Sequence, residues 1–216
     1  MRVYKYFHRK YSAAVQMGFY RLNTFENIRS YDIGNMIGDA TEAIARNTSG
    51  NLHIDNIHDP KYTKFIKDLS PYIVNTCQSD TSMTASMTVI GATMTNSLAD
   101  AYMFCATASR NDVYWANSEN YDACIEIKDF HDFSYRISQA FQVQEIAIYG
   151  YRTASCFFEE NKGVISEGTT KEPDYFRKPH THEIQKEVRT VFIPVKTTKL
   201  PPISLYVDVK DLVTFL

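Results

Sequence analysis

The sequence predicts an α+β fold, with a mixed and mostly antiparallel sheet and flanking helices. Segments with strand patterns alternate with helical segments, and no segment repeats along the chain. Roughly seven or eight strands are expected against four or five helices. The 15 tyrosines and 13 phenylalanines favour strands and amphipathic pocket walls. With 216 residues and no convincing linker, residues 1–216 are expected to form a single α+β domain.

The expected strands follow period-two alternation or short apolar runs bounded by turn residues. They are residues 2–7, 19–22, 82–91, 101–107, 123–127, 145–151, 188–195 and 203–207. The run over residues 101–107 is apolar on both faces, which is typical of a central buried strand.

Helices are expected at residues 11–17, 39–46, 60–69 and 130–141, with a single turn near residues 182–186. Gly18 would end the first helix. Asp39 with Glu42 resembles a capping box, and Asp59-Pro60 places a cap before proline at the first helical position. Residues 23–38 and 159–179 are polar or rich in glycine and proline, so both are expected to be long loops.

Composition excludes several classes of protein. A net charge of −2 gives no whole-surface attraction to nucleic acid or to an anionic membrane. No apolar run approaches the ~20 residues that span a bilayer, and no signal-peptide pattern opens the sequence. The four cysteines lie far apart without a C-x-x-C pair, so a zinc ribbon is not expected. We therefore expect a cytoplasmic protein in a reducing compartment, with no membrane partner.

The first candidate site lies on the N-terminal strands. Tyr4 and Tyr6 share one face of the first strand and Lys5 takes the other, while Tyr20 and Arg21 lie on the next strand. A basic group and aromatic rings could converge there and bind a ligand. The alternative is an edge strand whose tyrosine hydroxyls reach solvent.

The second candidate site is the segment Gln185-Lys186-Glu187-Val188-Arg189. Glu187 enters the strongest strand of the C-terminal half, and Gln185 precedes it by two residues, so both side chains would point the same way. A carboxylate that emerges from a buried sheet into a cleft can bind a ribose hydroxyl or hold a nucleophile. The alternative is a surface glutamate paired with Lys186 or Arg189.

Three further features leave alternatives open. Trp115 is either a packing plug or a stacking platform. His180 and His182 are a metal-like pair with no third ligand fixed by spacing, so no metal site is expected. A metal-dependent nuclease would use one of these histidines with Asp39 and Glu42, although the capping box already accounts for both carboxylates.

The order of these motifs resembles a family of bacterial and phage proteins that carry a domain of unknown function. The resemblance spans about residues 3 to 195, and the sequence lacks the Asn-Asp-Pro-Phe of many relatives. The matching pieces are Tyr4-Lys5-Tyr6, Gly18-Phe-Tyr-Arg21, Asp39 to Glu42, Phe104 to Ser109, Trp115 and Glu187-Val-Arg189.

That family is similar in layout to ADP-ribosyltransferase-like folds, which have a basic or aromatic residue on the first strand, a Ser/Thr or Tyr strand in the middle and a catalytic Glu on a late strand. Gln185-x-Glu187 is similar to the late motif, and Thr107 or Ser109 would supply the middle one. The resemblance implies an NAD-dependent ADP-ribosyltransferase-like enzyme, as a toxin or a phage-conflict protein, that modifies a protein or a nucleic acid.

The resemblance also implies a role for each candidate residue. Glu187 and Gln185 would act in catalysis, Lys5 or Arg21 would hold the pyrophosphate of NAD, and Tyr6, Tyr20 or Trp115 would stack on a ring. Tyr4 and Arg189 complete the expected cofactor site. The alternative to an enzyme is a binding module without catalytic activity, which would bind a nucleotide or a partner.

Overall fold

The computed structural model describes most of the chain, which divides into two compact units. The described residues are 1–30, 43–55, 59–62, 87–90, 92–110, 121–167, 171–195 and 200–216. The first unit, called the sheet unit below, comprises Met1–Ala45, Asn96–Asn161 and Glu172–Leu216. The second, called the small unit, comprises Arg46–Thr95 and Lys162–Lys171.

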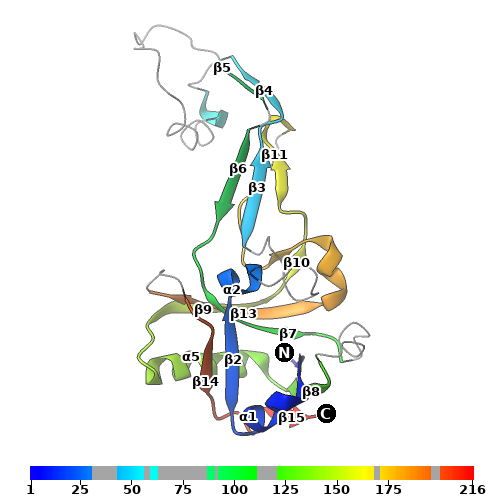
Figure 1. Ribbon diagram of the computed structural model, residues 1–216, viewed down its shortest axis with the longest axis vertical. Helices are drawn as coiled ribbons and strands as arrows, with labels where there is room; N and C mark the ends of the chain where they lie inside the picture. Colours follow the sequence, from blue (N-terminus) through cyan, green and yellow to red (C-terminus); the bar gives the residue numbers. More distant parts are fainter. Residues whose placement is uncertain are drawn as a thin grey trace. The chain divides into compact units, whose positions relative to one another are not determined.

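An eight-stranded sheet is the frame of the sheet unit (Figure 1), and every strand pair assigned in it is antiparallel. The predicted mostly antiparallel sheet is therefore confirmed. Its strands are β1 (Val3–Phe7), β2 (Phe19–Thr24), β7 (Tyr102–Thr107), β8 (Ala123–Ile127), β9 (Ile148–Ser155), β13 (Glu187–Pro194), β14 (Ile203–Tyr206) and β15 (Val213–Phe215).

The main sheet forks at β7. One edge of β7 pairs with β13 along its whole length, and β13 pairs in turn with β9. The opposite edge pairs with β2 at Tyr102 and Met103, and with β1 at Thr107. Among the described strands, none pairs with this second edge at residues 104–106. The arm of β2 continues to β14, and the arm of β1 continues to β8 and β15, so the two arms separate beside the middle of β7.

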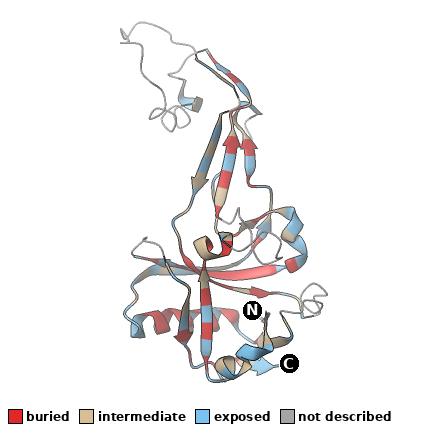
Figure 2. Ribbon diagram, in the orientation of Figure 1, coloured by how far each residue is buried: buried red, intermediate tan, exposed pale blue. Residues whose placement is uncertain are grey.

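One long helix, α5 (Phe130–Val143), packs on the sheet and supplies much of its core. Asp129 caps the helix by accepting hydrogen bonds from the backbone of His131 at 3.0 Å and Asp132 at 3.4 Å. Its buried residues recur every three or four positions, which places them on one face. Figure 2 shows this buried face and the burial of β13 along nearly its whole length.

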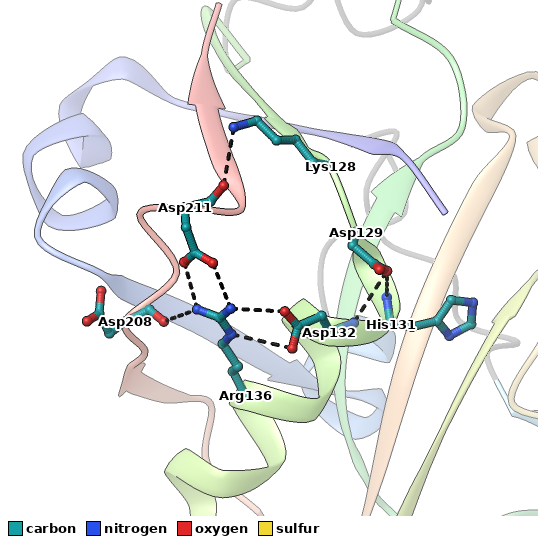
Figure 3. Close-up of polar contacts among 7 residues, drawn as sticks. All are labelled: Lys128, Asp129, His131, Asp132, Arg136, Asp208 and Asp211. Carbon is teal, nitrogen blue, oxygen red and sulfur yellow. Dashed lines mark hydrogen bonds and ion pairs between the residues drawn. The ribbon is translucent and has the colours of Figure 1, made fainter.

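A surface network joins α5 to the segment before β15 (Figure 3). The guanidinium of Arg136 lies 2.9 Å from a carboxylate oxygen of Asp132 on its own helix and 2.7 Å from each carboxylate oxygen of Asp211. It also donates to the backbone carbonyl of Asp208 at 3.0 Å, and Lys128 donates to the carbonyl of Asp211 at 3.2 Å. This network fixes the return of the chain to the β15 edge.

Short helices cover the connections of the sheet unit, and one of them corrects the predicted loop over residues 23–38. Helix α2 (Phe25–Arg29) lies inside that range, because Thr24 caps it through the backbone of Asn27 at 3.1 Å and Phe25 and Ile28 are buried. The expected first helix is present as η1 (Arg9–Tyr11) and α1 (Ser12–Gln16). The expected turn near 182–186 is η4 (His180–Gln185).

Two other corrections concern short strands. Ile44–Thr48 is a strand, β3, where a helix was predicted through residue 46, and its side chains alternate in burial as it pairs with β11 (Lys162–Val164). The predicted loop over residues 159–179 contains β11 and β12 (Arg177–Lys178), and β12 pairs with β10 (Phe157–Phe158). Both of these pairs are parallel and join segments distant in sequence, a contact that local patterns do not reveal.

The remaining strands and turns lie mostly in the small unit. They are β4 (Asn51–Ile54), β5 (Met87–Ile90), β6 (Thr93–Ser97), η2 (Pro60–Tyr62) and η3 (Ile165–Glu167). Strand β9 begins later than predicted, because Glu145, with φ of 58°, turns the chain after α5. The predicted Asp39 cap, residues 63–69 of a helix and the start of the strand near residue 82 lie outside the described residues. No helix in the described part of the chain is long and apolar enough to cross a membrane.

Candidate functional site

Two cavities of the sheet unit lie at the fork beside β7. The inner cavity has a volume of about 120 Å³ and the outer cavity about 590 Å³. They have four lining residues in common: Lys5, Tyr6, Asn23 and Tyr121. At this fork Cys105 and Ala106 of β7 line the inner cavity, and Phe104 of β7 lines the outer cavity. The gap between the strand arms therefore opens into a site of ligand size.

The register of β1, β7 and β13 places one predicted site residue of each strand directly opposite the next. Thr107 of β7 is the cross-strand partner of Tyr4 on β1 and of Glu187 on β13. Side chains of directly opposed residues point to the same face of a sheet, so these three share one face. All three line the inner cavity.

Glu187 is the centre of a buried charged network. Its Oε2 accepts a hydrogen bond from Lys178 Nζ at 2.6 Å, and its Oε1 accepts from Arg189 Nε at 2.8 Å and lies 2.6 Å from Arg189 Nη2. Lys178 Nζ also donates to Gln185 Oε1 at 2.8 Å. Burial by itself would raise the pKa of Glu187, but Arg189 and Lys178 together hold that pKa well below its usual range. Glu187 is therefore a carboxylate at neutral pH.

Arg189 is the fixed partner in this network. It is fully buried, follows Glu187 by two residues on the same face of β13, and donates to the backbone carbonyl of Tyr175 at 2.5 Å. Its guanidinium carbon lies 5.6 Å from the centroid of the Phe25 ring. Lys178 comes from the two-residue strand β12 and is itself buried, at 5% exposure.

Lys5 lines both cavities, and its Nζ lies 5.2 Å from the centroid of the Phe104 ring. Burial lowers the pKa of Lys5, and nearby Cys105 and Glu187 oppose that effect only in part. The thiol of Cys105 is itself held neutral, because burial and then Glu187 raise its pKa to about 12. The described cysteines, Cys105, Cys124 and Cys156, are all free thiols.

The outer cavity combines cations with aromatic rings. Lys5, Lys10 and Arg21 line it, and its described lining contains no aspartate or glutamate. Tyr11 and Phe19 line it too, and both residues are about half exposed. These are the groups that bind phosphates and flat rings.

Most of the predicted site residues lie together. Tyr4, Lys5, Tyr6, Gln185, Glu187 and Arg189 all line the inner cavity. Arg21 lies at the outer cavity only. Tyr20 is 3% exposed and packs edge-on against Phe133 in the core, so its ring is not open for stacking, and burial raises its pKa to about 12. Trp115 lies outside the described residues.

Lys178 is the member of the network that sequence reasoning missed. It lies in the range that was predicted to be an exposed loop, yet it is only 5% exposed. No local pattern marks it, because its burial depends on the pairing of β12 with β10. Lys186, the surface partner considered for Glu187, instead adopts φ of 42° at the end of η4.

His180 and His182, the metal-like pair of the sequence, both lie on η4. No group of three or more His, Cys, Asp or Glu side chains with metal-binding geometry occurs among the described residues. His180 Nδ1 lies 3.9 Å from Glu183, and both side chains are well exposed. Asp39 and Glu42, the carboxylates of the nuclease hypothesis, lie outside the described residues.

Comparisons with known proteins return no relative. No family model, no curated protein and no solved structure matches this chain.

Proposed function

We propose that this chain is an NAD-dependent ADP-ribosyltransferase-like enzyme whose cofactor binds at the fork of the sheet. One observation carries the proposal: Tyr4, Thr107 and Glu187 lie level on three adjacent strands, and Lys5 and Gln185 line the same cavity. This is the arrangement implied by the resemblance, with an aromatic or basic first strand, a hydroxyl on the middle strand and a glutamate on the late strand.

In this proposal Glu187 binds the hydroxyl of the nicotinamide ribose. Cleavage of the bond between nicotinamide and ribose passes through an oxocarbenium-like transition state, as glycoside cleavage does. A carboxylate beside the ribose stabilises the positive charge that develops. The low pKa of Glu187, caused by Arg189 and Lys178 against the effect of burial, keeps the group ionised for this task. Gln185 accepts a hydrogen bond from the same Lys178, and in this proposal it helps to orient the ribose.

Binding does not require Lys178 to leave Glu187. Each carboxylate oxygen offers two lone pairs, so Oε2 can accept a ribose hydroxyl beside the bond from Lys178 Nζ. Arg189 occupies Oε1 with two of its nitrogens and stays in place because it is fully buried.

The remaining parts of NAD fit the chemistry of the two cavities. An inner cavity of about 120 Å³ accommodates a single small ring, and the outer cavity of about 590 Å³ leaves room for the rest of the cofactor. Tyr6 would stack on the ring, while Arg21 or Lys5 would hold the pyrophosphate. The acceptor is a protein side chain or a nucleic-acid base.

Release of nicotinamide from NAD tests the proposal directly. Purified wild-type protein is incubated with NAD and a cell extract, and nicotinamide is quantified by chromatography. We expect Glu187→Gln to lower release by at least about 100-fold, the scale of losing one preorganised group that stabilises transition-state charge. Glu183→Gln, the same change four residues away on an exposed side chain, is the matched control and is expected to keep wild-type activity.

Both variants are first compared by far-UV circular dichroism, so that loss of activity is separated from loss of fold. Wild-type rates in Glu187→Gln protein that is folded would refute the catalytic role. Absence of NAD binding to the wild type by calorimetry would refute the proposal as a whole.

A second candidate, a nucleotide-binding module without catalysis, is favoured by one specific contact. Both oxygens of Glu187 already bind cations, and three cations line the inner cavity around this single described carboxylate. Such a site attracts phosphate even if Glu187 never contacts ribose. This candidate predicts that NAD or ADP binds to the wild type with no release of nicotinamide.

A further inference from the structure

Positive charge is concentrated at the start of the chain. Residues 1–21 contain five of the 23 lysines and arginines and none of the 25 aspartates and glutamates, in a chain whose net charge is −2. The five cations are Arg2, Lys5, Arg9, Lys10 and Arg21. Because salt screens charges that lie far apart, the field near this segment depends mainly on its own cations and their close neighbours. The segment can therefore attract an anion although the whole chain cannot.

These cations differ in what they contact. Arg2 Nε lies 3.0 Å from a carboxylate oxygen of Glu126. Arg9 Nε lies 3.9 Å from a carboxylate oxygen of Asp122. The other three cations line the outer cavity, and they are Lys5, Lys10 and Arg21. The positive charge of the segment is thus directed in large part into one cavity.

Two exposed aromatic residues line the same cavity beside the cations. Tyr11 is 50% exposed and lies in η1 with Lys10, whose Nζ is 5.1 Å from the centroid of the Tyr11 ring. Phe19 is 43% exposed and precedes Arg21 by two residues on β2. Residues 19–22 alternate between exposed and buried, so Phe19 and Arg21 lie on the same face of the strand. Each ring therefore has a cation next to it on its own element.

We propose that the outer cavity binds single-stranded nucleic acid. Lys10 and Arg21 contact its phosphates. Its unpaired bases stack on Tyr11 and Phe19. Cations that follow the backbone and aromatic side chains that stack on successive bases are the combination by which proteins hold single strands. An acidic protein would use the cations and leave both exposed rings without a role.

The inference goes beyond the proposed function, because binding of the strand requires no NAD. The four residues that it uses line the outer cavity and are not among the lining residues of the inner cavity, where Glu187 lies. Lys5 lines both cavities and remains the cation for the pyrophosphate of NAD. Failure of strand binding and failure of NAD turnover are therefore separate results.

Fluorescence anisotropy with labelled oligonucleotides of about 12 residues tests the inference on the full-length protein without NAD. A DNA strand and an RNA strand of one sequence are compared, and the tighter of the two identifies the kind of strand. The plot of log K against log salt should become shallower by about 0.7 in Lys10→Gln and in Arg21→Gln, since each variant loses one phosphate contact. Lys162→Gln, which changes an exposed lysine of the small unit, is the matched control and should keep the wild-type slope.

The rings are tested by changes that keep an apolar side chain. Tyr11→Leu and Phe19→Leu should each weaken binding by about fivefold to 150-fold, which is the effect of losing one base stacked on an aromatic ring. Tyr135→Leu is the matched control, because Tyr135 is 52% exposed on α5 and is not among the lining residues of either cavity. It should bind as the wild type does. Far-UV circular dichroism first establishes that each variant is folded.

An acidic peptide separates a nucleic acid from a protein as the ligand. Labelled oligoglutamate of the same length carries similar charge without bases, and it should bind at least about tenfold more weakly than the oligonucleotide. Equal affinity for the two probes would overturn the inference in favour of an acidic protein partner. Wild-type affinity in folded Tyr11→Leu and Phe19→Leu would overturn it too, as would no binding of either strand to the wild type at about 100 μM and low salt.

Discussion

Replacing Glu187 by glutamine should destabilise the protein strongly and in a pH-dependent way. The side chain is 8% exposed and accepts hydrogen bonds from Lys178 at 2.6 Å and from Arg189 at 2.8 Å. Glutamine leaves both cations buried without a counter-charge, and breaking a buried pair in this way costs about 3–5 kcal/mol. At pH 7 we therefore expect the free energy of unfolding to fall by about that amount.

The pH dependence follows from the pKa of Glu187, which Arg189 and Lys178 hold below its ordinary value despite the opposing effect of burial. As pH falls, the unfolded chain takes up the proton first, with an ordinary glutamate pKa of about 4.3. The contribution of the carboxylate to stability is complete above that value and is lost as pH falls through the lower pKa of the folded state. The gap in stability between wild type and Glu187→Gln should thus shrink below about pH 4.

Urea unfolding followed by far-UV circular dichroism, from pH 3 to pH 8, measures this gap. Glu183→Gln serves as the control, because its exposed carboxylate should change stability by no more than about 0.5 kcal/mol. A cost below about 1 kcal/mol for Glu187→Gln at pH 7 would refute the reasoning. So would a cost at pH 3 as large as the cost at pH 7.

Two further predictions concern the frame of the site. Gly18 has φ of +92° and a Cβ there would lie 2.7 Å from the carbonyl oxygen of Val207, so Gly18→Ala should lower the free energy of unfolding by about 1–3 kcal/mol in urea titrations. Gly150→Ala, where a Cβ meets nothing within 4 Å, should be neutral or stabilising by about 0.5 kcal/mol, and equal costs at both glycines would contradict this. Thr190→Val should lower the free energy of unfolding by about 1–3 kcal/mol in the same assay, because it removes a buried hydroxyl 2.6 Å from that of Ser134. A change below about 0.5 kcal/mol would count against a stabilising hydrogen bond between Thr190 and Ser134.

The strands that carry the site could be predicted because their patterns are local. Residues 101–107 are apolar on both faces, and they are buried in the structure as β7. The strand predicted at residues 188–195 is β13, which pairs on both edges and is buried along nearly its whole length. Period-two spacing also placed Gln185 and Glu187 as candidates for one site, and both line the inner cavity.

Two of the errors fall where segments that are separated in sequence pair. Ile44–Thr48 resembled the continuation of a capped helix, but the register with Lys162–Val164 makes it a strand. Arg177–Lys178 resembled an exposed loop for the same reason, so Lys178 was not recognised as a partner of Glu187. A short strand gains its stability from a partner far along the chain, and a single sequence contains no local signal of that partner.

The sequence by itself determined the mostly antiparallel α+β frame and the residue types available for a site, since periodicity and turn residues act locally. Only the tertiary structure decided that β1 and β2 diverge from the same edge of β7, that both cavities lie at this fork, and that two cations bind Glu187. The physical reason is that charge balance and cavities arise from side chains brought together across the sheet, and the pairing of strands, rather than the pattern within any one of them, sets those distances.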